Sequence, residues 1–127
     1  MVRLENPILS AMQDRELIFS SSDGAKDGVL IVTLDGPLLL GNLFDFQSAF
    51  RELKPPCLIL DLSNVPYMDS AGLGVLMNSY ISAQSNNRDF FVVGVNERVQ
   101  ALLEMTKVDQ ILKLYPSLEA AEAASQS

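Results

Sequence analysis

Residues 57–76 read CLILDLSNVPYMDSAGLGVL and contain the clearest change from strand to helix in the chain. The run from Cys57 to Leu62 is almost wholly apolar, which is typical of a central parallel strand in a sheet covered by helices on both faces. After residues 63–70, apolar side chains recur at helical spacing, and the predicted core-facing stripe comprises Leu73, Leu76, Met77, Tyr80 and Ile81. Residues 63–70 are therefore predicted to form a loop at the carboxyl edge of the sheet, where ligands and partners usually bind.

Strands and helices alternate on both sides of this segment. Further strands are predicted at residues 16–20, 29–34, 90–95 and 111–114. Further helices are predicted at residues 43–53, after Asn96 and after Ser117, with Asn42 and Asn96 as helix caps. This order predicts an α/β fold: a single domain with a mixed central β-sheet, parallel core strands and about four helices. We expect the domain to span residues 16–127 and residues 1–15 to form an N-terminal arm.

The composition narrows the function. The 127 residues include 16 acidic and 9 basic side chains, and the resulting formal charge of −7 disfavours binding to nucleic-acid phosphates. The chain has no histidine, which excludes a Ser-His-Asp triad and removes the commonest zinc ligand. No apolar run approaches the ~20 residues that cross a membrane. We expect a cytoplasmic protein that binds neither nucleic acid nor membrane and holds no cofactor or metal.

The segment from Met68 to Gly74 is the candidate functional site. Ser70 falls at or beside the start of the predicted helix, and the simplest interpretation is that Asp69 or Ser70 caps it. Gly72 and Gly74 suggest more, because a glycine within a helix costs about 1 kcal/mol relative to alanine. Their missing side chains would let another backbone or a bulky group approach closely. The positive end of the helix dipole also suits a phosphate on Ser70.

Other residues have plainer interpretations. Asp61 closes a strand, and we expect it to bind loop amides rather than to pair with Asp69 in acid–base catalysis. Phe44 lies off the stripe of its helix and is predicted to pack against a neighbouring loop. Cys57 is the only cysteine and is predicted to be a buried, inert thiol.

Residues 61–76, DLSNVPYMDSAGLGVL, closely resemble the signature of STAS domains, and more narrowly that of bacterial anti-sigma factor antagonists. The resemblance extends from about Leu17 to Ala120. It includes the Leu-x-Gly turn at residues 34–36 and the strand and turn at residues 90–96. The STAS fold, a mixed sheet with helices, agrees with the element order above.

The resemblance implies a switch. In that family the serine directly after the motif's aspartate is phosphorylated by a partner anti-sigma factor, itself a serine kinase, and Ser70 matches this position. The unphosphorylated domain binds the kinase and frees the sigma factor, and phosphorylation breaks the complex. Asp69 is then expected to orient the Ser70 hydroxyl, and catalysis belongs to the kinase, so the chain is not an enzyme. The implied partner-binding residues are Tyr67, Met68, Asp69, Ser70, Ala71, Gly72, Leu73 and Gly74.

The sequence departs from the family pattern at two positions that could affect partner choice or phosphorylation. Family members often carry Leu-Asp shortly after the Leu-x-Gly turn, but Leu39 follows Leu38 here. If the missing aspartate engages the kinase or its nucleotide, partner choice or phosphorylation differs. Leu39 thus favours an alternative: a non-phosphorylated interaction or scaffold module, or a small-ligand sensor, in a signalling complex. Ala71 removes a second candidate hydroxyl. A serine phosphatase is a further expected partner, and a weak homodimer would not be surprising.

Overall fold

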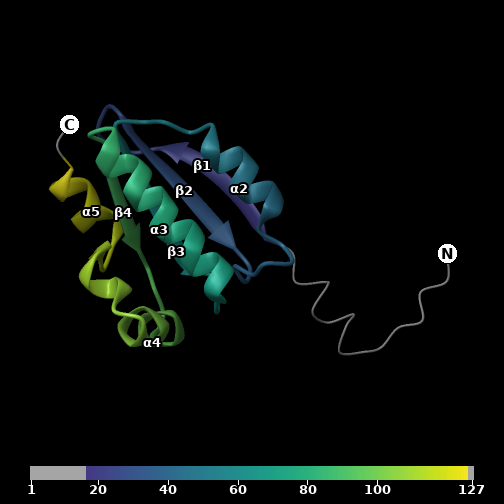
Figure 1. Ribbon diagram of the computed structural model, residues 1–127. Coiled ribbons are helices and arrows are strands. Elements are labelled where there is room, and N and C mark those ends of the chain that lie inside the picture. The colour runs from purple at the N-terminus through teal and green to yellow at the C-terminus, as the bar shows by residue number, and fades with distance from the viewer. Residues whose placement is uncertain (1–16, 126–127) are drawn as a thin grey trace, which may run out of the picture.

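The computed structural model describes residues 17–125 and arranges them as a five-stranded sheet with helices packed on it (Figure 1). The strands, in both sequence and spatial order, are β1 (Ile18–Asp23), β2 (Val29–Asp35), β3 (Cys57–Asn64), β4 (Asp89–Val93) and β5 (Lys113–Tyr115). β1 is antiparallel to β2, and every other neighbouring pair is parallel. The predicted mixed sheet with parallel core strands is confirmed. The N-terminal arm predicted for residues 1–15 lies outside the described residues.

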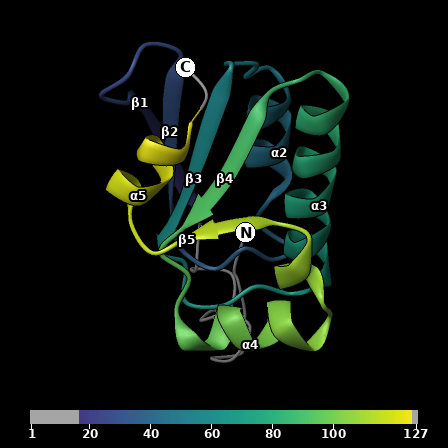
Figure 2. The same cartoon turned by 90° about the vertical axis from the view of Figure 1, so that its left-hand side faces the viewer.

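The described part of the chain has four α-helices, as predicted: α2 (Phe44–Arg51), α3 (Ser70–Ser85), α4 (Glu97–Met105) and α5 (Leu118–Ala124). A short 3-10 helix, η1 (Val108–Gln110), precedes β5. α2 and α3 cover one face of the sheet and α5 covers the other, while α4 lies beyond the end of the sheet to which β4 points (Figure 2). Within residues 17–125, no helix combines the length and apolar character needed to cross a membrane.

Alternation along the strands divides the core into two clusters. Successive side chains of a strand point to opposite faces, so neighbouring residues of β3 enter different layers. Leu60 packs with Phe46 of α2 and Leu76 of α3 in the larger cluster. Ile59 packs with Ala121 of α5 in the smaller one. Helices therefore cover both faces of β3, which explains its almost unbroken apolar sequence.

The buried face of α3 differs from the predicted stripe. Ile81 is 55% exposed, so its assignment to the core was wrong. The buried residues of the helix are Gly72, Val75, Leu76 and Ala83. The other predicted residues are only partly buried at the margin of the core, namely Leu73, Met77 and Tyr80. The small residues Gly72 and Ala83 face inward because they permit close packing. A prediction based on large apolar side chains does not detect them.

The two predicted asparagine caps have different outcomes. Asn96 caps α4, and its Oδ1 accepts a backbone N–H of the first turn at 2.8 Å. α2 begins instead after Leu43, which makes no side-chain cap hydrogen bond. Asn42 accepts the N–H of Leu39 at 2.9 Å and donates from Nδ2 to the carbonyl oxygen of Pro37 at 2.9 Å. The Asn42 side chain therefore stabilises the loop before α2 and does not cap the helix.

The Cys57 thiol makes the free energy of unfolding depend on pH in the alkaline range. The thiol is buried as predicted, and burial raises its pKa from 9.0 to about 11, with Asp89 and Glu122 adding to the rise and Lys26 opposing it. The folded state thus holds the thiol proton more tightly than the unfolded state does. This contribution is complete below pH 9.0 and is lost as the pH rises to about 11.

We expect the free energy of unfolding, measured by urea denaturation, to fall across that alkaline range. The fall should be steeper in the parent chain than in Cys57→Ala, which lacks the titrating group. Parallel pH dependences for the two proteins would show that the thiol contributes nothing.

Candidate functional site

Asp69 joins two segments at the start of α3. It is the N-cap of the helix, and its Oδ1 accepts the N–H groups of Ala71 at 3.0 Å and Gly72 at 3.1 Å. Its Oδ2 accepts the N–H of Leu40 at 3.0 Å. One carboxylate therefore both starts α3 and holds the loop of residues 37–42, here called the Leu38 loop.

The Leu38 loop runs beside the chain that leads into α3. Leu38 and Met68 form an isolated parallel β-bridge. The N–H of Leu38 donates to the carbonyl oxygen of Tyr67 at 3.1 Å, and the N–H of Asp69 donates to the carbonyl oxygen of Leu38 at 3.2 Å. A Cβ on Gly72 would lie 2.6 Å from that Leu38 oxygen. The lack of a side chain at Gly72 therefore makes room for the backbone of the Leu38 loop, which belongs to the domain itself.

Ser70 and Gly74 lie on the open side of α3. Ser70 is the first residue of the helix and is exposed. Gly74 follows one turn later on the same face, and a Cβ there would meet nothing within 4 Å. Asn78 and Ile81 continue this face and are also exposed. The Ser70 hydroxyl thus stands at the positive end of the helix dipole, where an added phosphate is favoured and meets no packed core.

Residues from α4 support the loop before Ser70. Asn96 donates from Nδ2 to the carbonyl oxygens of Pro66 at 3.1 Å and Val65 at 3.3 Å, in addition to capping α4. The guanidinium of Arg98 lies 4.8 Å from the centre of the Tyr67 ring, a cation–π contact. Sequence reasoning found Asn96 as a cap but missed its second role and missed Arg98, because both contacts join residues about thirty positions apart.

Two exposed apolar side chains lie near the start of α2, one on the Leu38 loop and one at the first residue of the helix. Leu40, whose N–H is bound by Asp69, is 72% exposed, and Phe44 is 74% exposed. The prediction that Phe44 packs against a neighbouring loop is wrong, because its ring projects from the first turn of α2 into solvent. The position of Phe44 off the apolar stripe of its helix agrees with this exposure, whereas no local pattern distinguished Leu40 from a core residue.

The predicted partner-binding residues divide by burial. Met68 and Gly72 are buried, so they can shape the site but present no surface to a partner. Ser70 is exposed, and the half-buried members of the set are Tyr67, Asp69, Ala71, Leu73 and Gly74. Asp61 lies outside this group, and its Oδ1 accepts the backbone N–H of Ser63 at 2.9 Å, as predicted for a residue that closes a strand.

Replacing Asp69 with alanine should lower the free energy of unfolding by about 1–3 kcal/mol. The change removes an N-cap, worth about 0.5–2 kcal/mol, and the hydrogen bond that holds Leu40. Asp69→Asn keeps one acceptor oxygen, so we expect it to lose less than half as much. Urea denaturation of the three proteins measures both differences. Equal stabilities of the parent chain and Asp69→Ala would rule out the dual role of this carboxylate.

Comparison with known proteins identifies the family and supports the fold. Residues 24–121 match the STAS domain family, and the chain belongs to that family. Within it, an anti-sigma F factor antagonist of Paenibacillus polymyxa is 33% identical over 92 residues, which are 69% of this chain and 79% of that protein. The crystal structure of an anti-sigma factor antagonist from Mycobacterium paratuberculosis matches with a TM-score of 0.74 at 26% identity, covering 87% of this chain and 96% of that chain.

A shorter match extends the same relationship. A Thermotoga neapolitana protein, also named for anti-sigma factor antagonism, is 39% identical over 64 residues, which are 50% of this chain. These residues span 57% of that protein, little more than half of its length. The predicted family and STAS-like fold are thereby confirmed, and the named relatives are anti-sigma factor antagonists.

Proposed function

We propose that this chain is an anti-sigma factor antagonist whose binding to its partner is controlled by phosphorylation of Ser70. Unmodified, it binds an anti-sigma factor that is a serine kinase, which frees the sigma factor for transcription. Phosphorylation of Ser70 by that kinase releases the chain, and a serine phosphatase restores it. The observation that carries the proposal is the exposed Ser70 hydroxyl at the first position of α3, with the open Gly74 one turn away.

The charge of the phosphate accounts for both halves of the switch. A phosphoserine adds about −1.5 to −2 charges, directly beside the Asp69 carboxylate. Within the domain, the helix dipole stabilises such an anion by about 0.3–1 kcal/mol, and the exposed position imposes no desolvation of the core. At an interface, like charges forced together cost several kcal/mol. The modification therefore acts on binding and leaves the fold intact.

Asp69 fixes the position of the site through its backbone contacts. Both of its carboxylate oxygens accept backbone N–H groups, from the first turn of α3 and from Leu40. These bonds hold the carboxylate beside Ser70, and its role in orienting the Ser70 hydroxyl stays a prediction. The chain supplies the acceptor serine, and the kinase supplies the catalytic groups and nucleotide, so the domain itself is not an enzyme.

The partner surface follows from exposure. Ser70 and Gly74 would form its centre, with the half-buried Tyr67 beside them and the exposed Leu40 on the Leu38 loop. Apolar side chains flanking a small polar centre suit a protein partner. Neither nucleic acid nor membrane enters this proposal, and its setting is the cytoplasm.

A pull-down from native lysate tests the proposal. The purified chain, immobilised through a terminal tag, is incubated with lysate of its source organism, with or without ATP and magnesium. We expect it to retain a kinase-sized protein without ATP and to release it when intact mass shows a phosphate on Ser70. Phosphorylation at another residue, or retention that ATP does not alter, would refute the switch.

Leu39 favours a second candidate function. The side chain stands where related sequences often carry an aspartate, on the Leu38 loop that contacts the start of α3. In that case the domain is an interaction or scaffold module that binds its partner without being phosphorylated. Intact mass of the protein isolated from its own cells, in growing and stressed cultures, separates the two. A chain without phosphate in every condition supports the scaffold.

A further inference from the structure

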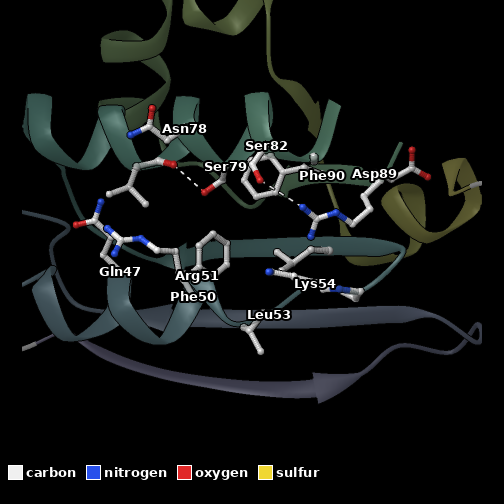
Figure 3. A pocket seen from close by; sticks show the side chains of 15 residues that line it. Gln47, Phe50, Arg51, Leu53, Lys54, Asn78, Ser79, Ser82, Asp89 and Phe90 are labelled. Carbon is white, nitrogen blue, oxygen red and sulfur yellow. Dashed lines mark hydrogen bonds between the residues drawn. The ribbon is translucent and has the colours of Figure 1, made fainter. Parts of the chain in front are cut away.

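A cavity opens between α2 and α3, separate from the start of α3 (Figure 3). Its volume is ≈ 180 Å³. The wall on α3 consists of later turns of the helix, between Val75 and Ala83, and the opposite wall is the end of α2. The apolar lining includes Phe50, Leu53, Leu58, Val75, Ala83 and Phe90. In Figure 3 the Phe50 and Phe90 rings lie between the two helices, so an apolar body placed there would contact aromatic side chains.

Three cations line the same cavity. Arg51 ends α2, Lys54 follows it, and Arg88 lies just before β4. They are three of the nine basic residues in a chain of net charge −7. The guanidinium of Arg88 donates to the neutral Ser82 hydroxyl at 3.3 Å. Among the described residues that line the cavity, Asp89 is the only carboxylate, and Figure 3 shows its side chain pointing away from the cavity.

We propose that this cavity binds a small carboxylate with a phenyl-sized apolar body. Cavities of about 150 Å³ lined by leucine, isoleucine and phenylalanine bind benzene, so this one can hold a ring of that size. Arginine matches the planar carboxylate with paired N–H donors, and Lys54 adds a point charge. Arg51 and Lys54 are exposed and Arg88 is half-buried, whereas Leu58, Val75, Ala83 and Phe90 are buried, which orients the ligand with its charged end outward.

The site is independent of the switch at Ser70. The two share only α3, whose first turn carries Ser70 and whose later turns line the cavity. A chain that is never phosphorylated would still bind the carboxylate, and a chain without the ligand site would still switch. Failure of one proposal therefore leaves the other standing.

An NMR titration of the full chain tests the proposal. ¹⁵N-labelled protein is titrated with 3-phenylpropionate and, in parallel, with the neutral 3-phenylpropanamide, which has the same body without the charge. A ligand of this size binds in the millimolar range or more tightly. We expect saturable shifts at amides of residues 50–54 and 78–83, and an affinity for the amide lower by about tenfold or more, because a hydrogen bond to a charged group is lost.

Variants locate the charge. Arg88→Gln and Arg51→Gln should each weaken 3-phenylpropionate by about tenfold, whereas Lys113→Gln, on the opposite face of the sheet, should not. Arg51 is an exposed residue, so its variant gives a reading even if Arg88→Gln fails to fold. Ser79→Leu should abolish binding by filling the cavity from α3. Equal affinity for acid and amide, shifts elsewhere in the domain, or no saturation by about 10 mM would overturn the proposal.

Discussion

Replacing Gly72 with alanine should destabilise the domain by about 1–3 kcal/mol, the cost of overpacking a filled site. The new Cβ would lie 2.6 Å from the carbonyl oxygen of Leu38 and 3.1 Å from the Cβ of Met68. Neither atom is the far end of a flexible side chain. Because the Leu38 loop is hydrogen-bonded on both sides of this contact, it can move away only by giving up those bonds. Urea denaturation measures the loss.

Gly74→Ala provides the matched control, because it makes the same chemical change two residues later. A Cβ there meets no atom within 4 Å, so the helix propensity of alanine decides the result. We expect a gain of up to about 1 kcal/mol in the free energy of unfolding. Effects of the same sign and size at the two positions would mean that the contact with the Leu38 loop does not set the requirement for Gly72.

Replacing Ser70 with aspartate should weaken binding to the anti-sigma partner by about 100-fold. Several kcal/mol of like-charge repulsion at an interface corresponds to a change of that order. The stability of the free domain should change by less than about 1 kcal/mol, because position 70 is exposed at the positive end of a helix. Titration calorimetry against the partner captured in the pull-down gives the affinity, and urea denaturation gives the stability.

Two further variants separate charge from size. Ser70→Ala should bind within about threefold of the parent chain and accept no phosphate. Ser70→Asn has the shape of the aspartate variant without its charge, and we expect it to bind far more tightly than Ser70→Asp. If asparagine and aspartate weaken the complex equally, the side chain acts by steric exclusion and the charge switch is wrong.

Much of the fold was predictable because its signals are local. The apolar run at Cys57–Leu62, interrupted only by Asp61, and the cap at Asn96 indicate a strand and a helix from a few adjacent residues, and the structure has both. The inward face of α3 was not predictable in this way. Gly72 and Ala83 are buried for their small size, a property that depends on which segment lies opposite them.

In the candidate site, too, the local features were predictable and the contacts between distant residues were not. Asp69 and Ser70 could be placed at a helix start from their neighbours alone, and the structure has Asp69 as the N-cap and Ser70 as the first helical residue. The hydrogen bond between Asp69 and Leu40 joins residues 29 positions apart, and the sequence next to either residue does not predict it. The cations of the cavity are likewise scattered between Arg51 and Arg88, so only the packing of α2 against α3 reveals them as a group.

The most direct test compares one protein in two states. The chain is phosphorylated by its captured kinase with ATP and magnesium, the modified residue is mapped by peptide mass spectrometry, and both forms are titrated against that partner in nucleotide-free buffer. We predict a single phosphate on Ser70, thermal unfolding midpoints of the two forms within a few degrees of each other, and an affinity at least tenfold lower for the phosphorylated form. Equal affinities of the two forms would contradict the account.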